Sequence, residues 1–155
     1  MKIPRHCQEK ACSDFFAFFA RFEYAMKVVG FRSRTDGQVT PDWNALADIV
    51  RDYLNNNLRK KTKDAIDYLL TYPPKRQDVV NDVLKWVDVP ANQGDRISDL
   101  FVYIRRVRNN LFHGGKFKGK YLDYPERSIE LMEHCITILK ACLEANDDLR
   151  EAFEH

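Results

Sequence analysis

Apolar residues recur at steps of three and four positions along most of the chain, which is the spacing of amphipathic helices. The segment 14–30, "DFFAFFARFEYAMKVVG", has such a stripe, with Ser13 placed to cap its amino end and Gly30 placed to end it. Thr40 and Pro41 form a second start signal, a capping hydroxyl followed by a proline at the first helical position. We therefore expect long helices that begin near Ser13 and near Thr40. Their apolar stripes are Phe15, Phe18, Phe22, Met26 and Val29 in the first, and Trp43, Leu46, Ile49, Val50, Tyr53 and Leu54 in the second.

The middle of the chain carries weaker helical patterns and several interruptions. The polar string 55–61, "NNNLRKK", weakens or divides the helix that begins at Thr40. The apolar pattern after it stops at the prolines 73–74, which end any helix. We interpret the segment 31–39, "FRSRTDGQV", as a loop and the segment 77–90, "QDVVNDVLKWVDVP", as a short helix.

Two further long helices are expected in the second half of the chain. One begins at Asp95 and should end near Gly114 and Gly115, because glycine commonly follows a helix end, and Pro125 opens the other. The pattern contains neither an internal repeat nor a linker, and 155 residues suffice for one hydrophobic core. We predict an all-α protein, a single bundle of about four to six helices over residues 1–155.

The cysteines and the amino terminus bear on compartment and cofactors. "MKIPRHCQEK" has no apolar signal-peptide core, and no apolar run approaches the roughly 20 residues that span a bilayer. These patterns predict a soluble cytoplasmic protein with reduced thiols and no membrane contact. The spacing of His6, Cys7 and Cys12 fits no common zinc pattern, and Cys135 and Cys142 are seven residues apart, a core spacing on a helix. We expect no metal and no cofactor.

The segment 105–116, "RRVRNNLFHGGK", concentrates chemistry that the rest of the chain lacks. From Arg105 to Lys120 there are six Lys or Arg and no Asp or Glu, although the net charge of the whole chain is only +2. Arginine offers a planar, permanently charged fork for phosphate oxygens, and histidine exchanges protons near neutral pH. Three explanations remain open at this point: a catalytic group, a phosphate-binding surface, and a helix end whose cations complement the macrodipole.

Helix geometry adds a constraint on this segment. At about 100° per residue, Asn109 and His113 are about 40° apart and share a face, whereas Arg108 and His113 are roughly 140° apart. One straight helix therefore does not aim both at one small target, unless it unwinds at the glycines or two copies each lend a part. Such groups can cleave RNA without metal: a base activates the ribose 2′-OH, a cation stabilises the phosphate, and an acid protonates the leaving oxygen. The absence of a nearby carboxylate cluster argues against a two-metal nuclease.

The segment 108–113, "RNNLFH", resembles the R-x4-6-H motif of the HEPN superfamily, with a polar residue directly after the arginine. The resemblance implies a small helical bundle and a metal-independent endoribonuclease that works as a homodimer on RNA. By position, Arg108 and His113 would be the catalytic pair and Asn109 their polar partner, while Arg105, Lys116 and Lys118 of the basic patch would bind the substrate.

Many members of that superfamily act in toxin–antitoxin, abortive-infection or other antiviral systems, so an antitoxin or another regulatory protein is a possible partner. Other members have lost activity, and the alternative is a catalytically inactive module that binds RNA, a nucleotide or a protein partner. Some members place an acidic residue of the first helix near the site, where this chain has Glu23. We favour an exposed pair of Glu23 with Lys27, four residues on.

Overall fold

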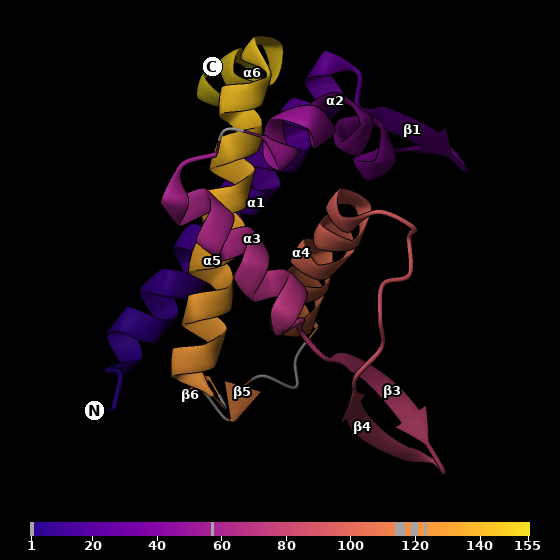
Figure 1. Cartoon of the computed structure of the whole chain (residues 1–155). Helices are drawn as coiled ribbons and strands as arrows, with labels where there is room; N and C mark the ends of the chain where they lie inside the picture. Colours follow the sequence, from indigo (N-terminus) through magenta and orange to yellow (C-terminus); the bar gives the residue numbers. More distant parts are fainter. Residues whose placement is uncertain (1, 57, 114–116, 119–120, 123) are drawn as a thin grey trace.

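The computed structural model describes residues 2–56, 58–113, 117–118, 121–122 and 124–155, and these residues are mostly helical. Short antiparallel hairpins interrupt the series of helices (Figure 1). The helices are α1 (Arg5–Val29), α2 (Trp43–Asn55), α3 (Lys60–Thr71), α4 (Arg96–Phe112), α5 (Pro125–Ala145) and α6 (Asp147–Glu154). The strands are β1 (Arg32–Thr35), β2 (Gln38–Pro41), β3 (Arg76–Val80), β4 (Val83–Val87), β5 (Phe117–Lys118) and β6 (Tyr121–Leu122).

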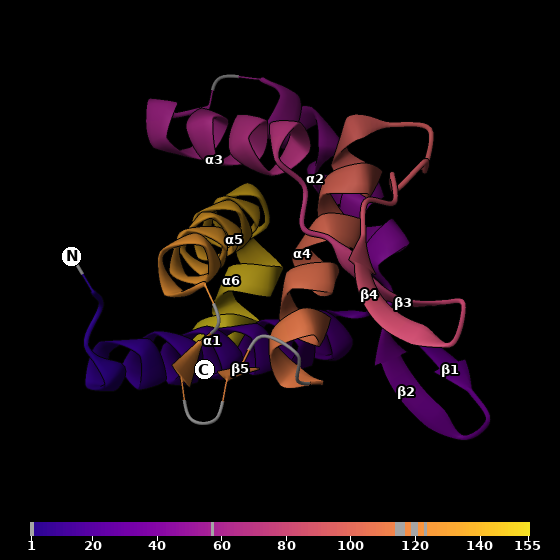
Figure 2. The same ribbon diagram turned by 90° about the horizontal axis from the view of Figure 1, so that it is seen from below.

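The helices surround one hydrophobic core, as the amphipathic stripes predicted, but Ile49 and Tyr53 of the second predicted stripe are exposed. The long α1 packs against α5 and α6, α3 packs against α4 and α5, and α2 packs against α4 (Figure 2). Aromatic side chains form the centre: Phe15, Phe22 and Phe101 are buried, and the indole of Trp43 stacks on Phe22. Cys135 and Cys142 are buried in the same core, which confirms the interpretation of their spacing.

The first helix begins before Ser13, so the start predicted near Ser13 is wrong. α1 starts at Arg5, directly after Pro4, and Ser13 lies inside it. The polar-looking first turns are helical because Gln8 and Cys12 turn inward, and the side-chain amide of Gln8 donates to the Ile3 carbonyl. Gly30 ends the helix with a φ of 104°, a left-handed conformation that glycine adopts without strain, as predicted.

The start predicted at Thr40 is displaced to Asp42. The Asp42 carboxylate accepts a hydrogen bond from the Ala45 amide and so caps α2, while Pro41 pairs with Arg32 in the first hairpin. Aspartate is a stronger cap than threonine, and the proline is accommodated in a strand. The polar string after Asn55 divides this region into α2 and α3, as predicted.

Two segments fold as β-hairpins and contradict the predictions made for them. Residues 31–39, expected to be a loop, contribute to β1 and β2, and residues 77–90, expected to be a short helix, contribute to β3 and β4. Both hairpins turn through two residues with positive φ: Asp36 with Gly37, and Asn81 with Asp82. Such turns match the twist of the flanking strands, so the dipeptides Asp36–Gly37 and Asn81–Asp82 were a hairpin signal.

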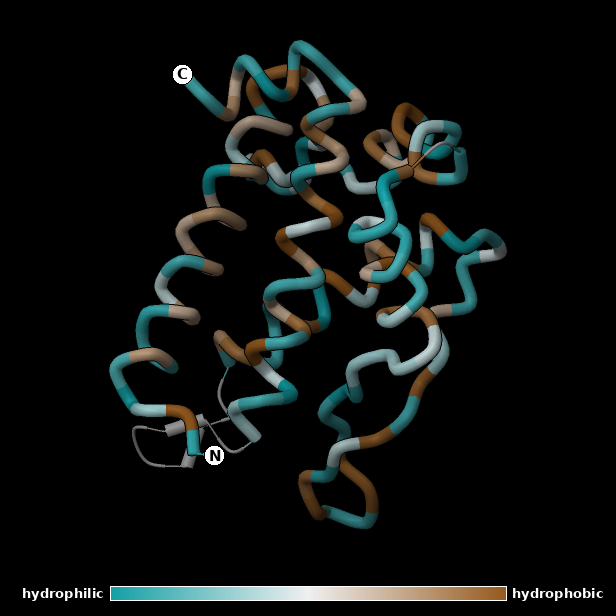
Figure 3. The backbone as a smooth tube through the Cα atoms, turned by 60° about the vertical axis from the view of Figure 1, so that its left-hand side comes forward, coloured by the Kyte–Doolittle hydropathy of each residue, from teal (hydrophilic) through white to brown (hydrophobic). Residues whose placement is uncertain are grey.

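The β3–β4 hairpin projects from the bundle, and exposed apolar residues flank its polar Asn81–Asp82 turn (Figure 3). Its base is fixed to α4 by Arg106, which is buried and donates to the carbonyls of Pro74 and Val89 on the two sides of the hairpin. The side-chain amide of Asn110 adds a bond to the Lys75 carbonyl. Arg106 and Asn110 therefore lie on the face of α4 that holds the hairpin. Arg108 lies on the opposite face of the helix.

α4 begins at the predicted residue. The Asp95 carboxylate accepts from the backbone amides of Ile97 and Ser98, from the Ser98 hydroxyl at 2.6 Å and from the Arg51 guanidinium. The Ser98 hydroxyl, followed by Arg51 and the two amides, lowers the pKa of Asp95 from 3.8 to about 2.

This cap makes the stability of the protein depend on pH in a defined window. Because the pKa of Asp95 is lower in the folded state, its contribution is present above about pH 4 and is lost as the pH falls towards 2. We expect Asp95→Asn to lower the free energy of unfolding at neutral pH, with the difference from wild type shrinking between pH 4 and pH 2. Urea unfolding across this range measures it, and a difference that is independent of pH would contradict the assignment.

Candidate functional site

The carboxyl half of α4 meets α1 at a charged contact between the helices. We call this contact the seam; its residues are Arg105, Arg108 and Asn109 of α4, Phe19 and Glu23 of α1, and Trp43 of α2. Arg108 Nη1 donates to Glu23 Oε1 at 2.9 Å, and the two side chains are 30% and 17% exposed. Glu23 is therefore not the exposed partner of Lys27 that its spacing favoured. It continues the line of Phe16 and Phe19 along α1, the face that α4 contacts, and this placement turns its carboxylate towards α4.

Three contacts fix the guanidinium of Arg108. Besides the ion pair with Glu23, its Nε donates to Asn109 Oδ1 at 2.8 Å, and its Cζ lies 5.0 Å from the ring centroid of Phe19. A guanidinium held by a carboxylate, an amide and an aromatic face has little rotational freedom. Arg108 and Asn109, predicted as site residues from the motif, thus form one hydrogen-bonded unit.

A second arginine and a tryptophan complete the seam. Glu23 Oε2 accepts from Trp43 Nε1 at 3.3 Å, and the Arg105 guanidinium lies 5.8 Å from the Trp43 ring. Burial lowers the pKa of Arg105 from its ordinary value, the charge of Arg108 lowers it further, and Glu23 offsets part of this effect. Glu23 is thus the carboxylate that balances two neighbouring cations.

His113 stands at the carboxyl end of α4 with an exposed side chain. Its backbone amide donates to the Asn109 carbonyl at 2.9 Å, so the helical pattern continues up to it. Its ring lies 5.2 Å from that of Phe112, which contacts Phe16 of α1 edge-on. Because α4 is helical through Phe112, it does not unwind between Arg108 and His113, and the two side chains leave the helix in different directions.

Part of the predicted site falls outside the described residues. Lys116 lies there, as do Gly114 and Gly115, where the helix was predicted to end. Lys118 belongs to β5, but its side chain also lies outside the described set. The cations of the basic patch whose side chains are described are therefore Arg105 and Arg108, which lie in the seam, and Arg106, which holds the β3–β4 hairpin.

Sequence reasoning missed the roles of Glu23, Trp43 and Phe19. The available signal was the position of Glu23 in line with apolar residues, since a carboxylate on a buried stripe usually has a cationic partner. That partner is 85 residues away in the sequence, so spacing alone did not identify it.

Chemically, the seam offers two fixed guanidinium groups and an amide, and His113 adds an exposed imidazole at the end of the same helix. These groups can hold phosphate oxygens and transfer protons. Among the residues that the structure describes, no cluster of three His, Cys, Asp or Glu is arranged to hold a metal ion. None of the described helices is long and apolar enough to cross a membrane. Compared with known proteins, the chain matches no family model, no curated protein and no solved structure.

Proposed function

We propose that the protein is a metal-independent endoribonuclease of HEPN type, in which Arg108 and His113 assist attack of the ribose 2′-OH on the adjacent phosphate. The observation that carries the proposal is the fixed guanidinium of Arg108, held by Glu23, Asn109 and Phe19 near the exposed end of α4 that bears His113. The reaction requires a positioned cation and a proton-exchanging group, and Arg108 and His113 are residues of these two kinds.

In the proposed reaction, an imidazole takes the proton of the 2′-OH, and the 2′ oxygen forms a bond to phosphorus. The bond from phosphorus to the 5′ oxygen then breaks, and an acid protonates the leaving oxygen, which gives a cyclic phosphate and a free 5′-OH. Arg108 stabilises the charge that builds on the phosphate oxygens. Arg105, Lys116 and Lys118 bind the flanking phosphates of the RNA.

The divergence of Arg108 and His113 on a continuous helix supports a homodimer in this proposal. In a dimer with the two α4 ends near its symmetry axis, one copy supplies the arginine and the other supplies the histidine. Light scattering tests the assembly, and a strict monomer at micromolar concentration would count against it. The resemblance of residues 108–113 to the HEPN motif supports a role as a toxin or antiviral effector that an antitoxin or another regulatory protein controls.

The alternative is a non-catalytic module that binds RNA, a nucleotide or a protein. One observation favours this alternative: the Glu23 carboxylate already neutralises part of the positive charge of the Arg108 guanidinium. The variant His113→Ala distinguishes the two proposals. It should abolish RNA cleavage if the protein is an enzyme, and it should leave ligand binding unchanged if the protein is a binding module. The deciding experiment is incubation of wild type and His113→Ala with RNA in EDTA.

We expect Glu23→Gln to slow RNA cleavage about 10-fold, mainly through kcat, with KM changed little. Glutamine retains the shape of the side chain but loses the charge that orients Arg108, and tenfold corresponds to about 1.4 kcal/mol. Single-turnover kinetics measure the effect. The matched control is Glu9→Gln, which removes an exposed ion pair with Arg5 on the same helix. An equal loss in both variants would show that Glu23 does not position Arg108.

A further inference from the structure

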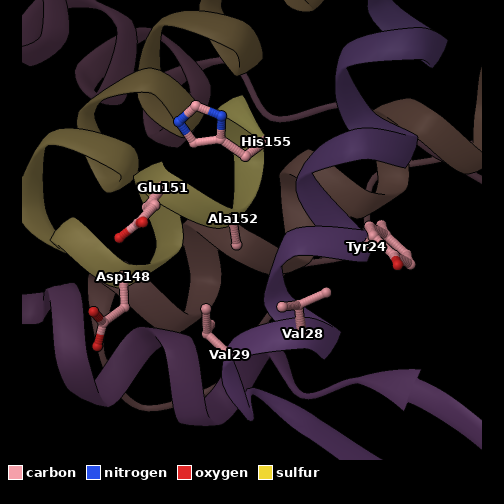
Figure 4. Close-up of a pocket in the computed structure, with 7 residues that line it drawn as sticks. All are labelled: Tyr24, Val28, Val29, Asp148, Glu151, Ala152 and His155. Atoms are coloured by element: carbon pink, nitrogen blue, oxygen red, sulfur yellow. The ribbon is translucent and has the colours of Figure 1, made fainter.

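A surface groove lies between the carboxyl half of α1 and α6. It has a volume of about 560 Å³ and is lined by Tyr24, Val28 and Val29 of α1, by Asp148, Glu151 and Ala152 of α6, and by His155, which follows α6. Figure 4 shows the valines on one side of the groove and the residues of α6 on the other. None of these residues takes part in the seam around Arg108.

The α1 side of the groove is apolar and exposed. Tyr24 and Val28, one helical turn apart, are 63% and 52% exposed, and Val29 and Ala152 are half-buried beside them. Exposed apolar side chains that line one groove offer a surface on which the apolar side chains of another protein can pack. Tyr24 and Val28 do not contribute to the hydrophobic core, which α1 meets through other residues.

The α6 side of the groove is acidic. Its sequence, "DDLREAFE", has four carboxylates and one arginine, Arg150, which pairs with Asp147. Asp148 and Glu151 have no ion pair with any described residue. The guanidinium of the nearby Arg21 donates a hydrogen bond to the Glu154 carbonyl and lies over the Phe153 ring. The rim of the groove is therefore negative, in contrast to the basic patch at the end of α4.

We propose that this groove binds an amphipathic helical segment of a partner protein, with apolar anchors one turn apart and Lys or Arg along their flank. The anchors would pack on Tyr24 and Val28, and the cations would face Asp148 and Glu151, the mode in which an amphipathic helix lies in an apolar groove. The same carboxylates repel RNA and an anionic membrane surface, which selects a basic protein segment among the possible occupants. This inference does not depend on the proposed ribonuclease activity.

The test is fluorescence anisotropy with a labelled Leu/Lys amphipathic peptide about five helical turns long. A Leu/Glu peptide with the same pattern and a scrambled Leu/Lys peptide are the comparison probes. We expect binding of the amphipathic Leu/Lys peptide alone, weakened at least tenfold by Val28→Asp. The double variant Asp148→Asn with Glu151→Gln should weaken binding several-fold and reduce its salt dependence.

The matched control is Ile49→Asp, which introduces the same charge at a position that is 53% exposed on α2, outside the groove. Circular dichroism should show the same helicity for all variants. Equal binding of the scrambled peptide, equal loss in Ile49→Asp and Val28→Asp, or binding that a folded Val28→Asp protein retains in full would each overturn the proposal. So would groove-dependent binding of a labelled RNA or of anionic vesicles, since either would identify a different occupant.

Discussion

Arg108→Ala and His113→Ala are each expected to reduce the rate of RNA cleavage by about 10²- to 10⁴-fold, the range typical of a positioned acid–base or charge-stabilising group. The structure explains why Arg108 is effective: Glu23, Asn109 and Phe19 hold its guanidinium before substrate arrives. His113 is exposed and terminates α4, so its removal should leave the core undisturbed.

The two variants need different controls. Among the described residues, Arg108→Ala leaves Glu23 with Trp43 as its hydrogen-bond donor, so Arg108→Lys, which retains a cation without the planar fork, is the matched variant. Asn109→Ala should cost less than either catalytic substitution, because an orienting amide moves no proton. Lys118→Ala should mainly weaken RNA binding and reduce its salt dependence. Rates are compared only among variants with unchanged circular dichroism and melting temperature.

Trp43→Ala is expected to lower the free energy of unfolding by about 3–5 kcal/mol, the range for deletion of a large core aromatic side chain. The indole is 5% exposed, and its ring lies 5.7, 5.8 and 5.5 Å from those of Phe19, Phe22 and Phe101. Its loss opens a cavity where α1, α2 and α4 meet, and it also removes the hydrogen bond to Glu23. Urea unfolding followed by circular dichroism measures the change.

Trp43→Phe separates the two contributions, because phenylalanine keeps much of the apolar contact and lacks the donor. We expect it to destabilise the protein less than Trp43→Ala. Trp86→Ala is the matched control, since Trp86 lies on the projecting β4 strand and is only partly buried. If Trp86→Ala cost as much as Trp43→Ala, the aromatic cluster would not be the main source of stability at this junction.

The helices with strong local signals were predictable from the sequence. Asp95 and Pro125 mark the starts of α4 and α5 because a capping carboxylate and a first-turn proline act within a few residues of themselves. The hairpin at residues 76–87 was not predicted, because Val80, Val83 and Val87 also have helical spacing. The Asn81–Asp82 turn, with positive φ at both residues, resolved that ambiguity in favour of strands.

The candidate site was predictable only on one side of the seam. Arg108 and Asn109 are neighbours in the sequence, so their hydrogen bond is local. The pairing of Arg108 with Glu23 depends on how α1 packs against α4, and helical periodicity within α1 indicates which face is buried but not which residue of another helix that face meets. Local spacing therefore suggested Lys27 as the partner of Glu23, whereas tertiary packing places its carboxylate on Arg108.

The central claim, metal-independent attack by the ribose 2′-OH, is tested most directly by product analysis of RNA incubated with the protein in EDTA. The account predicts fragments with a cyclic phosphate and a free 5′-OH, no cleavage of the matching DNA, which lacks the nucleophile, and strong loss in His113→Ala. Cleavage that requires Mg²⁺, or that persists undiminished in a folded His113→Ala protein, would contradict it.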